Sequence, residues 1–347
     1  MNSKKIKFSV IIILYNQMKY VGDCIQSVIN QTYPVYELII VNDGSTDGGG
    51  AYVREWAEKY PDLITVYDQE NAGAFVARAT GMKHVTGDYF IVVDSDDMLR
   101  SDALNLAADR ITATNAELLL INISEKADFS VPLLDYKAIG ISPDSDGKVE
   151  RGEYLVALSS SCAINGMYIK FYMTNLIDMA QIDKYGKGVK QGEDRIHTLI
   201  LSDKAERIAL LDECLYYYRP NPDSVCHVFN PYNMESAVKY CQVSRIYATR
   251  WFDEAKAKTL MDDFEFEEIN ARFWQPFSWC HSWREIRHAL KIAFENEYAC
   301  NVLKRKLLEK QSWKKSLLLK AFVNKNYFLL YCIYMRIKLA QFCRKIG

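Results

Sequence analysis

The chain has 347 residues, of which 49% are apolar and 25% charged, and its 43 basic and 44 acidic side chains give a net charge of −1. These values are typical of a folded soluble protein with one extended domain or two smaller ones, and they exclude an intrinsically disordered chain. Nine cysteines occur without a C-x-x-C pair after a polar start, which predicts free thiols in the cytosol and argues against a disulfide framework or a zinc site.

Short apolar runs and amphipathic segments alternate along the first part of the chain. The runs are rich in Val and Ile, as in buried strands, and they cover residues 8–14, 37–41, 63–67 and 89–93. Helical spacing of apolar residues marks 21–29, and further helices are expected before Pro61 and over 73–85. Strands that alternate with helices in this way predict an α/β fold, a doubly wound, mostly parallel sheet with right-handed crossovers.

An acidic quartet, Asp94, Ser95, Asp96 and Asp97, follows the fourth predicted strand. Side chains two apart on an extended backbone share a face, so Asp94 and Asp96 should point together from the carboxyl end of the strand, where α/β sheets bind ligands. Two adjacent carboxylates repel unless a cation lies between them, and hard oxygen ligands suit Mg²⁺ or Mn²⁺. The alternative is a surface turn that caps the next helix, which we prefer for Asp97 and Ser101 but not for Asp94 and Asp96.

Four motifs follow one another in a fixed order: SVIIILYN at 9–16, VNDGSTD at 41–47, NAGAFVARATG at 71–81 and DSDD at 94–97. Each motif alone is weak, but together they resemble the nucleotide-binding region of bacterial family 2 glycosyltransferases with the GT-A fold. The resemblance covers residues 8–98 and implies a transferase that uses a nucleotide-diphospho-sugar.

The resemblance implies that six residues contact the nucleotide: Tyr15, Asp43, Asn71, Arg78, Asp94 and Ser95. Asp43 follows a strand, so its carboxylate can accept the imide N–H of uracil, and an Asx turn is the alternative. Arg78 lies on a predicted helix and can offer its planar guanidinium to the base or phosphates, or form a surface ion pair. Asn71 can instead cap that helix. By the same resemblance, Asp94 contacts the ribose or the metal, and Asp96 holds Mn²⁺ or Mg²⁺ on the diphosphate.

Further elements are predicted as a helix over 101–114 and strands over 117–122, 207–211 and 214–219. Glu193 and Asp194 open an amphipathic helix after a loop rich in Gly and Lys. Simple capping of that helix is one interpretation, whereas the resemblance implies that Asp194 is the catalytic base. The resemblance also lets Arg219 and Ser224 hold the diphosphate and makes His227 a third metal ligand, although a lone His is more often structural.

Strand signals end near Pro231, which predicts two domains. We expect a GT-A domain over 1–228, with a nucleotide half (1–98) and an acceptor half (99–228), followed by a helical extension over 229–347. Residues 301–347 hold twelve Lys and Arg against one Glu, a local charge of +11. With the apolar run at 327–335, this pattern predicts a tail that lies on an anionic membrane surface rather than on nucleic acid. The alternative is packing of this run against the catalytic domain or a second subunit.

The sequence therefore predicts a metal-dependent, inverting glycosyltransferase that moves a sugar, most simply from a UDP-sugar, to a hydroxyl of a glycan or lipid-linked acceptor in cell-surface polysaccharide synthesis. The alternatives are a sugar nucleotidyltransferase and a non-catalytic scaffold at the membrane. The expected location is the cytoplasm, on the inner face of the cell membrane where the tail docks, and a homo-oligomer is compatible with the pattern.

Overall fold

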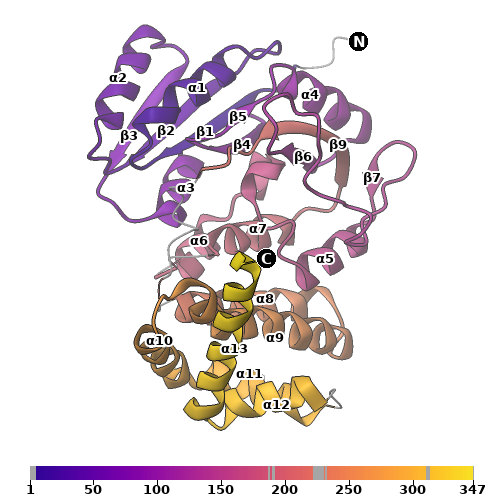
Figure 1. Ribbon diagram of the computed structural model, residues 1–347. Coiled ribbons are helices and arrows are strands. Elements are labelled where there is room, and N and C mark those ends of the chain that lie inside the picture. The colour runs from indigo at the N-terminus through magenta and orange to yellow at the C-terminus, as the bar shows by residue number, and fades with distance from the viewer. Residues whose placement is uncertain are drawn as a thin grey trace. The chain divides into compact units, whose positions relative to one another are not determined.

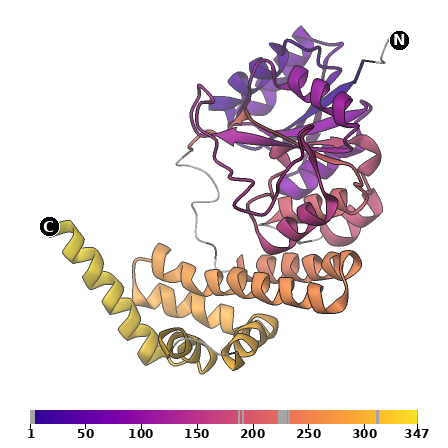
Figure 2. The same cartoon turned by 90° about the vertical axis from the view of Figure 1, so that its right-hand side faces the viewer.

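Figures 1 and 2 show the computed structural model, which describes residues 5–186, 188–189, 192–221, 230, 233–309 and 313–346. These residues form two compact units, one ending at Asn221 and one following it. The predicted domain boundary between 228 and 229 lies outside the described residues. The assignment of separate nucleotide and acceptor halves stays a prediction.

Four parallel strands form one side of the sheet in the first unit, in the order β3-β2-β1-β4. Their bounds are β1 Phe8–Leu14, β2 Glu37–Asp43, β3 Ile64–Gln69 and β4 Tyr89–Asp94. The apolar runs of β1, β2 and β4 are almost entirely buried, which explains why they are continuous rather than alternating. The chain moves outward from β1 to β3 and then returns to β4 on the other side of β1. In open α/β sheets, ligands bind at the carboxyl ends of the strands where the order reverses, which here are those of β1 and β4.

Helices cover both faces of these strands, as Figure 1 shows. Their bounds are α1 Met18–Ile29, α2 Gly49–Lys59 and α3 Ala74–Lys83. Helices α1 and α2 pack on each other, whereas α3 lies across β1 and β2. A Cβ atom at Gly81 of α3 would lie 2.5 Å from Ile11 Cγ2, so a glycine permits the close approach of α3 to β1. The predicted doubly wound α/β arrangement is therefore confirmed.

The sheet continues from β4 through β8, β6 and β9 to β5, and β7 pairs with β9. The bounds are β5 Met98–Leu99, β6 Leu118–Ser124, β7 Lys148–Val149, β8 Lys170–Met173 and β9 Ile208–Tyr217. The helices of this region are α4 Ala103–Thr114, α5 Arg151–Ser160, α6 Met179–Gly186 and α7 Glu193–Asp203. Strand β9 corrects the prediction of two strands over 207–211 and 214–219. Its register against β6 shifts beside Asn122, and this irregularity accommodates the exposed Asp212 and Glu213 without ending the strand.

The described part of the second unit is helical throughout. Its helices are α8 Asn233–Trp251, α9 Glu254–Trp279, α10 Trp283–Glu295, α11 Glu297–Leu308, α12 Trp313–Val323 and α13 Tyr327–Ile346. Rings from three helices form its core, where Phe273 packs against Phe294 and Phe322 at centroid distances of 5.3 and 5.5 Å. The predicted helical extension is confirmed. Within the described ranges, none of the helices has the length and apolar character needed to cross a bilayer.

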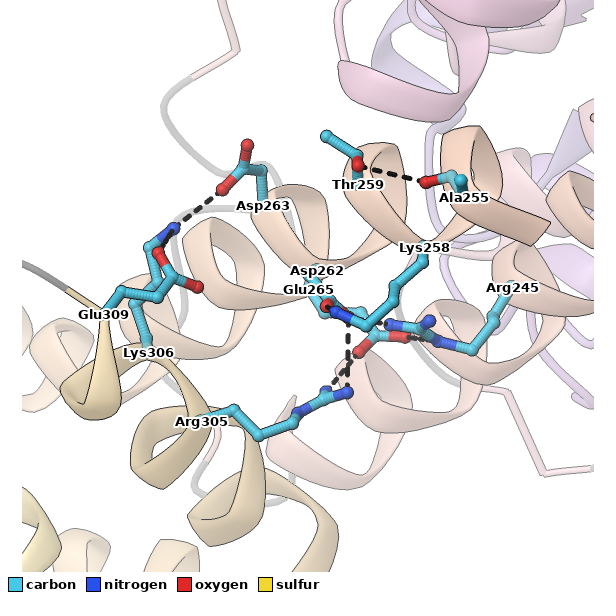
Figure 3. Close-up of polar contacts among 10 residues, drawn as sticks. All are labelled: Arg245, Ala255, Lys258, Thr259, Asp262, Asp263, Glu265, Arg305, Lys306 and Glu309. Carbon is cyan, nitrogen blue, oxygen red and sulfur yellow. Dashed lines mark hydrogen bonds and ion pairs between the residues drawn. The ribbon is translucent and has the colours of Figure 1, made fainter. Parts of the chain in front are cut away.

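Acidic side chains of α9 join α8 to α11 (Figure 3). The fully buried Glu265 accepts hydrogen bonds from Arg245 Nε at 2.6 Å and Arg305 Nη2 at 2.8 Å. Asp262 Oδ1 accepts from the same two guanidinium groups at 2.7 and 3.2 Å. Two charged donors replace the water that Glu265 loses on burial, so the network fixes these three helices relative to one another.

Replacing Glu265 with Gln should lower the free energy of unfolding of the second unit by about 2–4 kcal/mol. The substitution removes the shared negative charge and turns an amide N–H group towards a guanidinium. Asp263 is the matched control, because its exposed carboxylate makes a 2.7 Å ion pair with Lys306, and Asp263→Asn should cost less than about 1 kcal/mol. Urea unfolding measures both variants, and equal losses would show that Glu265 has no special role in the helical unit.

Candidate active site

The turn after β4 is anchored by the end of β9 and the residues that follow it. The Tyr216 hydroxyl donates to Asp97 Oδ2 at 2.6 Å and accepts from the Asp94 N–H at 3.1 Å. Arg219 donates from its backbone N to Asp97 Oδ1 at 2.8 Å and from Nε to the Asp96 carbonyl at 2.7 Å. Asp97 is only 2% exposed, and burial, together with the charges of Asp94 and Asp96, raises its pKa to about 8.

This arrangement corrects the prediction that Asp97 or Ser101 caps the next helix. Helix α4 begins after Asp102, whose own side chain makes no capping hydrogen bond, and the Leu104 N–H in its first turn donates to Gln31 Oε1 at 3.0 Å. Asp97 points instead into the interior, where it holds the turn that carries Asp94 and Asp96. The spacing of the acidic quartet gives no indication of this, because the partners of Asp97 come from β9, far along the chain.

Asp94 and Asp96 extend from the end of β4, and each has one carboxylate oxygen bound by a neighbour. Asp94 Oδ1 accepts from Arg78 Nη2 at 3.2 Å, and Asp96 Oδ2 accepts from Asn221 Nδ2 at 2.9 Å. The second oxygen of each carboxylate accepts no hydrogen bond from the described residues. Burial, opposed by Arg78 and reinforced by Asp96, raises the pKa of Asp94 above its usual range, so a nearby cation would relieve a real electrostatic cost.

This pair of carboxylates fits a divalent cation. Hard oxygen donors suit Mg²⁺ and Mn²⁺, which are commonly held by one or two carboxylates together with substrate phosphates. Across the described ranges, no cluster of three or more His, Cys, Asp or Glu could hold a metal by protein ligands alone. The predicted ligand His227 and the predicted diphosphate contact Ser224 lie outside the described residues, so their roles stay predictions.

Arg78 is the centre of the site, because its guanidinium joins the end of β4 to the start of α7. Its Nη1 lies 3.0 Å from Glu193 Oε1 and 2.5 Å from Asp194 Oδ1, and its Nη2 binds Asp94. Only 3% of Arg78 is exposed, which excludes the surface ion pair considered as an alternative. Burial opposes its positive charge, but the three carboxylates outweigh burial and raise the pKa of Arg78. One buried cation therefore holds three acids from distant parts of the chain.

Asp194 lies in the first turn of α7, behind Gly192, which has a left-handed φ of 74°. Burial raises the pKa of Asp194 to about 7, although Arg78 opposes the shift. The fully buried Lys170 donates from Nζ to the carbonyls of Ile164 and Gly166 at 2.5 and 2.8 Å. Burial also lowers the pKa of Lys170, to about 7. A carboxyl group with a pKa near neutrality can release and accept protons at physiological pH, which a general base requires.

Asp43 holds the segment that leads into α3. Its carboxylate is 3% exposed and accepts from Gln69 Nε2 at 2.8 Å, the Ala72 N–H at 2.8 Å and the Gly73 N–H at 2.9 Å. These bonds join Asp43 to residues 26 to 30 positions along the chain, which an Asx turn would not do, and the contact of Asp43 with uracil stays a prediction. Gly44 has a φ of 72°, and a Cβ atom there would lie 2.8 Å from the Asn71 backbone N, so a glycine is needed beside this segment.

The remaining predicted nucleotide residues lie at the same edge of the sheet. Tyr15 follows β1 and is 46% exposed, Ser95 is 4% exposed within the turn, and Asn71 precedes α3 on the surface. Asn71 does not cap α3, whose first turn follows Gly73 without a side-chain cap. The Arg219 guanidinium donates from Nε to the Asp96 carbonyl and from Nη2 to Asp23 Oδ2 at 3.2 Å, so Arg219 also lies beside the turn.

Sequence reasoning missed four residues that build the site. Asn221 binds Asp96, Tyr216 supports the turn, Glu193 shares Arg78, and Lys170 holds the backbone near Asp194. The Tyr-Tyr-Tyr-Arg run at the end of β9 is the one local signal for Tyr216. Glu193 is marked by its place beside Asp194 at the start of a predicted helix, whereas Asn221 and Lys170 carry no signal that distinguishes them from ordinary polar residues.

Comparison with known proteins gives a consistent result. Residues 9–145 match the family model described as "Glycosyl transferase family 2". The chain is 29% identical over 236 residues to glycosyltransferase GlyA of Streptococcus pneumoniae, covering 67% of this chain and 33% of that protein. It is 25% identical over 269 residues to the poly(ribitol-phosphate) beta-N-acetylglucosaminyltransferase TarS of Staphylococcus aureus, covering 77% and 44%. The chain thus spans less than two thirds of these curated relatives.

Solved structures show the same fold. A fragment of Staphylococcus aureus TarS in complex with UDP-GlcNAc is similar with a TM-score of 0.63 and 22% identity, covering 92% of this chain and 89% of that one. A mannosyltransferase of Pyrobaculum calidifontis, in complex with GDP-Man and Mn²⁺, has a TM-score of 0.54 and 17% identity, covering 94% and 88%. At these identities the likeness concerns the fold.

Proposed function

Because residues 9–145 match the family model of glycosyl transferase family 2, we propose that the chain moves a sugar from a nucleoside diphosphate to a hydroxyl group of a glycan or lipid-linked acceptor in cell-surface polysaccharide synthesis. The observation that carries this proposal is the cluster around Arg78. One buried guanidinium holds Asp94, at the end of the nucleotide-binding strands, against Asp194, at the start of α7. The proposed leaving-group site and the proposed base thereby lie on the same guanidinium.

Asp194 is the general base of the proposed reaction. The acceptor hydroxyl gives its proton to the Asp194 carboxylate while its oxygen forms a bond to the anomeric carbon of the donor sugar. The bond between that carbon and the diphosphate breaks, and its electron pair leaves with the nucleoside diphosphate. A single in-line displacement inverts the anomeric configuration. General-base assistance of this kind contributes typically ~10²–10⁴-fold to the rate.

Asp94 and Asp96 would hold the divalent cation, Mn²⁺ or Mg²⁺, beside the departing diphosphate. When bound, such a cation supplies positive charge against the negative charge that develops on the leaving group. Asn221 and Tyr216 orient these carboxylates by binding Asp96 and the backbone of Asp94. Arg219 lies beside the same turn and can add a second positive charge at the diphosphate.

A UDP-sugar is the proposed donor. The support is the fold shared with the TarS fragment whose structure contains UDP-GlcNAc, together with the acidic turn and the Asp43 loop at the carboxyl edge of the sheet.

We further propose that residues 301–347 bring the protein to the anionic inner surface of the cell membrane. The support is their charge of +11 and the exposed apolar side chains of Leu308 and Phe328, which are 89% and 78% accessible.

A panel of nucleotide sugars with Mn²⁺ tests the proposed function through slow donor hydrolysis. Hydrolysis of a UDP-sugar is expected, and Asp96→Ala should weaken Mn²⁺-dependent UDP binding in calorimetry by more than about tenfold while circular dichroism stays unchanged. Asp62→Asn removes an exposed carboxylate before β3 and serves as the control. Absence of hydrolysis for every donor, with equal UDP affinity in all three proteins, would reject the transferase and leave the scaffold alternative.

A further inference from the structure

An open cavity of about 1040 Å³ lies beside α10 and the start of α13. Its lining includes Trp283, Arg284, Arg287, His288, Lys291 and Tyr327. The cavity belongs entirely to the helical unit, and the chemistry derived above uses none of these residues. Its lining combines cations with aromatic rings, which indicates an anionic ligand rather than an apolar one.

Three cations of this cavity form a stripe on α10. Arg284, Arg287 and Lys291 follow the spacing i, i+3, i+7, so they lie on one face of the helix, while Ile286 and Leu290 are buried on the other. None of the three has a carboxylate of the described residues within ion-pair distance, in contrast to Arg245 and Arg305 of the same unit. The stripe therefore presents uncompensated positive charge to the cavity.

The one carboxylate in the lining is already engaged. Glu285 accepts from Ser282 Oγ at 2.8 Å and from the His281 N–H at 3.0 Å. These hydrogen bonds, chiefly the one from Ser282, lower the pKa of Glu285, as expected for a capping box at the start of α10. With three cations and one carboxylate in its lining, the cavity carries a net positive charge.

An apolar stripe on α13 borders the cavity. Phe328, Tyr331 and Met335 follow the spacing i, i+3, i+7 and are 78%, 38% and 40% exposed. The Tyr331 ring contacts the Trp283 ring of the cavity at a centroid distance of 5.2 Å. Positive charge and exposed apolar side chains are thus adjacent on one surface, the combination found in helices that lie in a membrane interface.

We propose that this cavity binds the phosphate of an anionic lipid headgroup while Phe328 and Met335 enter the interface of the same bilayer. The inference rests on the proposed membrane docking and assigns the headgroup contact to α10, outside the basic tail. Arginine guanidinium groups bind phosphate through two parallel hydrogen bonds, and Trp283 and Tyr327 have the amphipathic rings typical of headgroup depth. A soluble polyanion would use the cations but not the exposed apolar stripe on α13. The presence of both features therefore favours a lipid over a soluble polyanion as the ligand.

Flotation of the full-length protein with phosphatidylcholine vesicles, with and without phosphatidylglycerol, tests this proposal. The wild type should float only with the anionic vesicles. The triple variant Arg284→Gln, Arg287→Gln, Lys291→Gln should bind the anionic vesicles roughly 100-fold more weakly, because each positive charge lost near the surface weakens binding about fivefold. The charge-matched control Lys126→Gln, Lys137→Gln, Lys256→Gln removes three exposed lysines elsewhere and should stay within about threefold of the wild type.

Donor hydrolysis without vesicles separates this inference from the proposed function. Hydrolysis should be equal in the wild type and the α10 triple variant, and its absence from both would count against the transferase rather than the cavity. Vesicle binding by the triple variant equal to that of the wild type would overturn the headgroup site, as would full binding by Phe328→Ser. Tighter binding of a soluble glycerol-phosphate polymer than of vesicles, lost in the triple variant, would assign the cavity to a phosphodiester glycan and overturn the lipid.

Discussion

Replacing Asp194 with Asn should lower the rate of sugar transfer by about 10²–10⁴-fold while the affinity for the donor stays nearly unchanged. The amide has almost the same shape as the carboxylate but cannot accept the proton of the acceptor hydroxyl. The Arg78 guanidinium, at 2.5 Å from Asp194 Oδ1, would still have Asp94 and Glu193 as partners, so the fold of the site should persist. Steady-state kinetics and calorimetry with UDP measure the two effects separately.

The pH profile provides a stricter test of the same residue. Because burial raises the pKa of Asp194 to about 7, the carboxyl group is largely protonated below that pH and cannot act as a base. The wild-type transfer rate should therefore rise with pH through about 7 and level off above it, and this limb should vanish in Asp194→Asn. Glu193→Gln is the matched control, since it neutralises the neighbouring carboxylate and should keep the limb. A limb that survives in Asp194→Asn would assign the base to another group.

The strands and helices of residues 8–94 could be predicted well because their signals are local. The strands β1 to β4 are continuous apolar runs, and the turns that follow them contain Gly, Asn and Asp at recognisable positions. The acidic turn could be located for the same reason, since Asp94 and Asp96 directly follow a buried strand. Local patterns identify which residues end at the carboxyl edge of the sheet, but they do not identify their partners.

The partners come from residues far along the chain, and this is where the predictions fail. Asp97 was expected to cap α4, yet its partners Tyr216 and Arg219 lie more than a hundred residues away. Strand β9 was divided in two because Asp212 and Glu213 interrupt its apolar pattern, although both are simply exposed at an irregularity in the pairing with β6. A hydrophobic pattern records burial, so it cannot show a strand that continues through exposed positions.

Arg78 shows the same limitation at the centre of the site. On the sequence it is one cation in a helix, and a surface ion pair is a reasonable interpretation. In the fold it is almost fully buried and binds Asp94, 16 residues along the chain, as well as Glu193, 115 residues along the chain. The three carboxylates come together only because α7 begins beside the end of β4, and Arg78 makes that approach electrostatically possible.

Replacing Arg78 with Met should lower the free energy of unfolding of the first unit by about 3–5 kcal/mol and abolish measurable transfer. The substitution keeps the length and apolar stem of the side chain but leaves Asp94, Glu193 and Asp194 without their shared cation. Thermal unfolding measures the loss of stability, and for a unit of this size the melting temperature should fall by roughly 5–15 °C. Arg78→Lys should lose less stability, because it keeps the charge but cannot extend two N–H groups to separate acids.

A double substitution distinguishes electrostatic repulsion from a simple packing defect. If the carboxylates repel one another in Arg78→Met, then adding Asp194→Asn should recover about 1–2 kcal/mol of the lost stability, because it removes one of the three negative charges. In the background of wild-type Arg78, the same Asp194→Asn change removes a favourable ion pair and should be neutral or destabilising. Additive losses in the double variant would mean that Arg78 stabilises the site by filling space rather than by joining its acids.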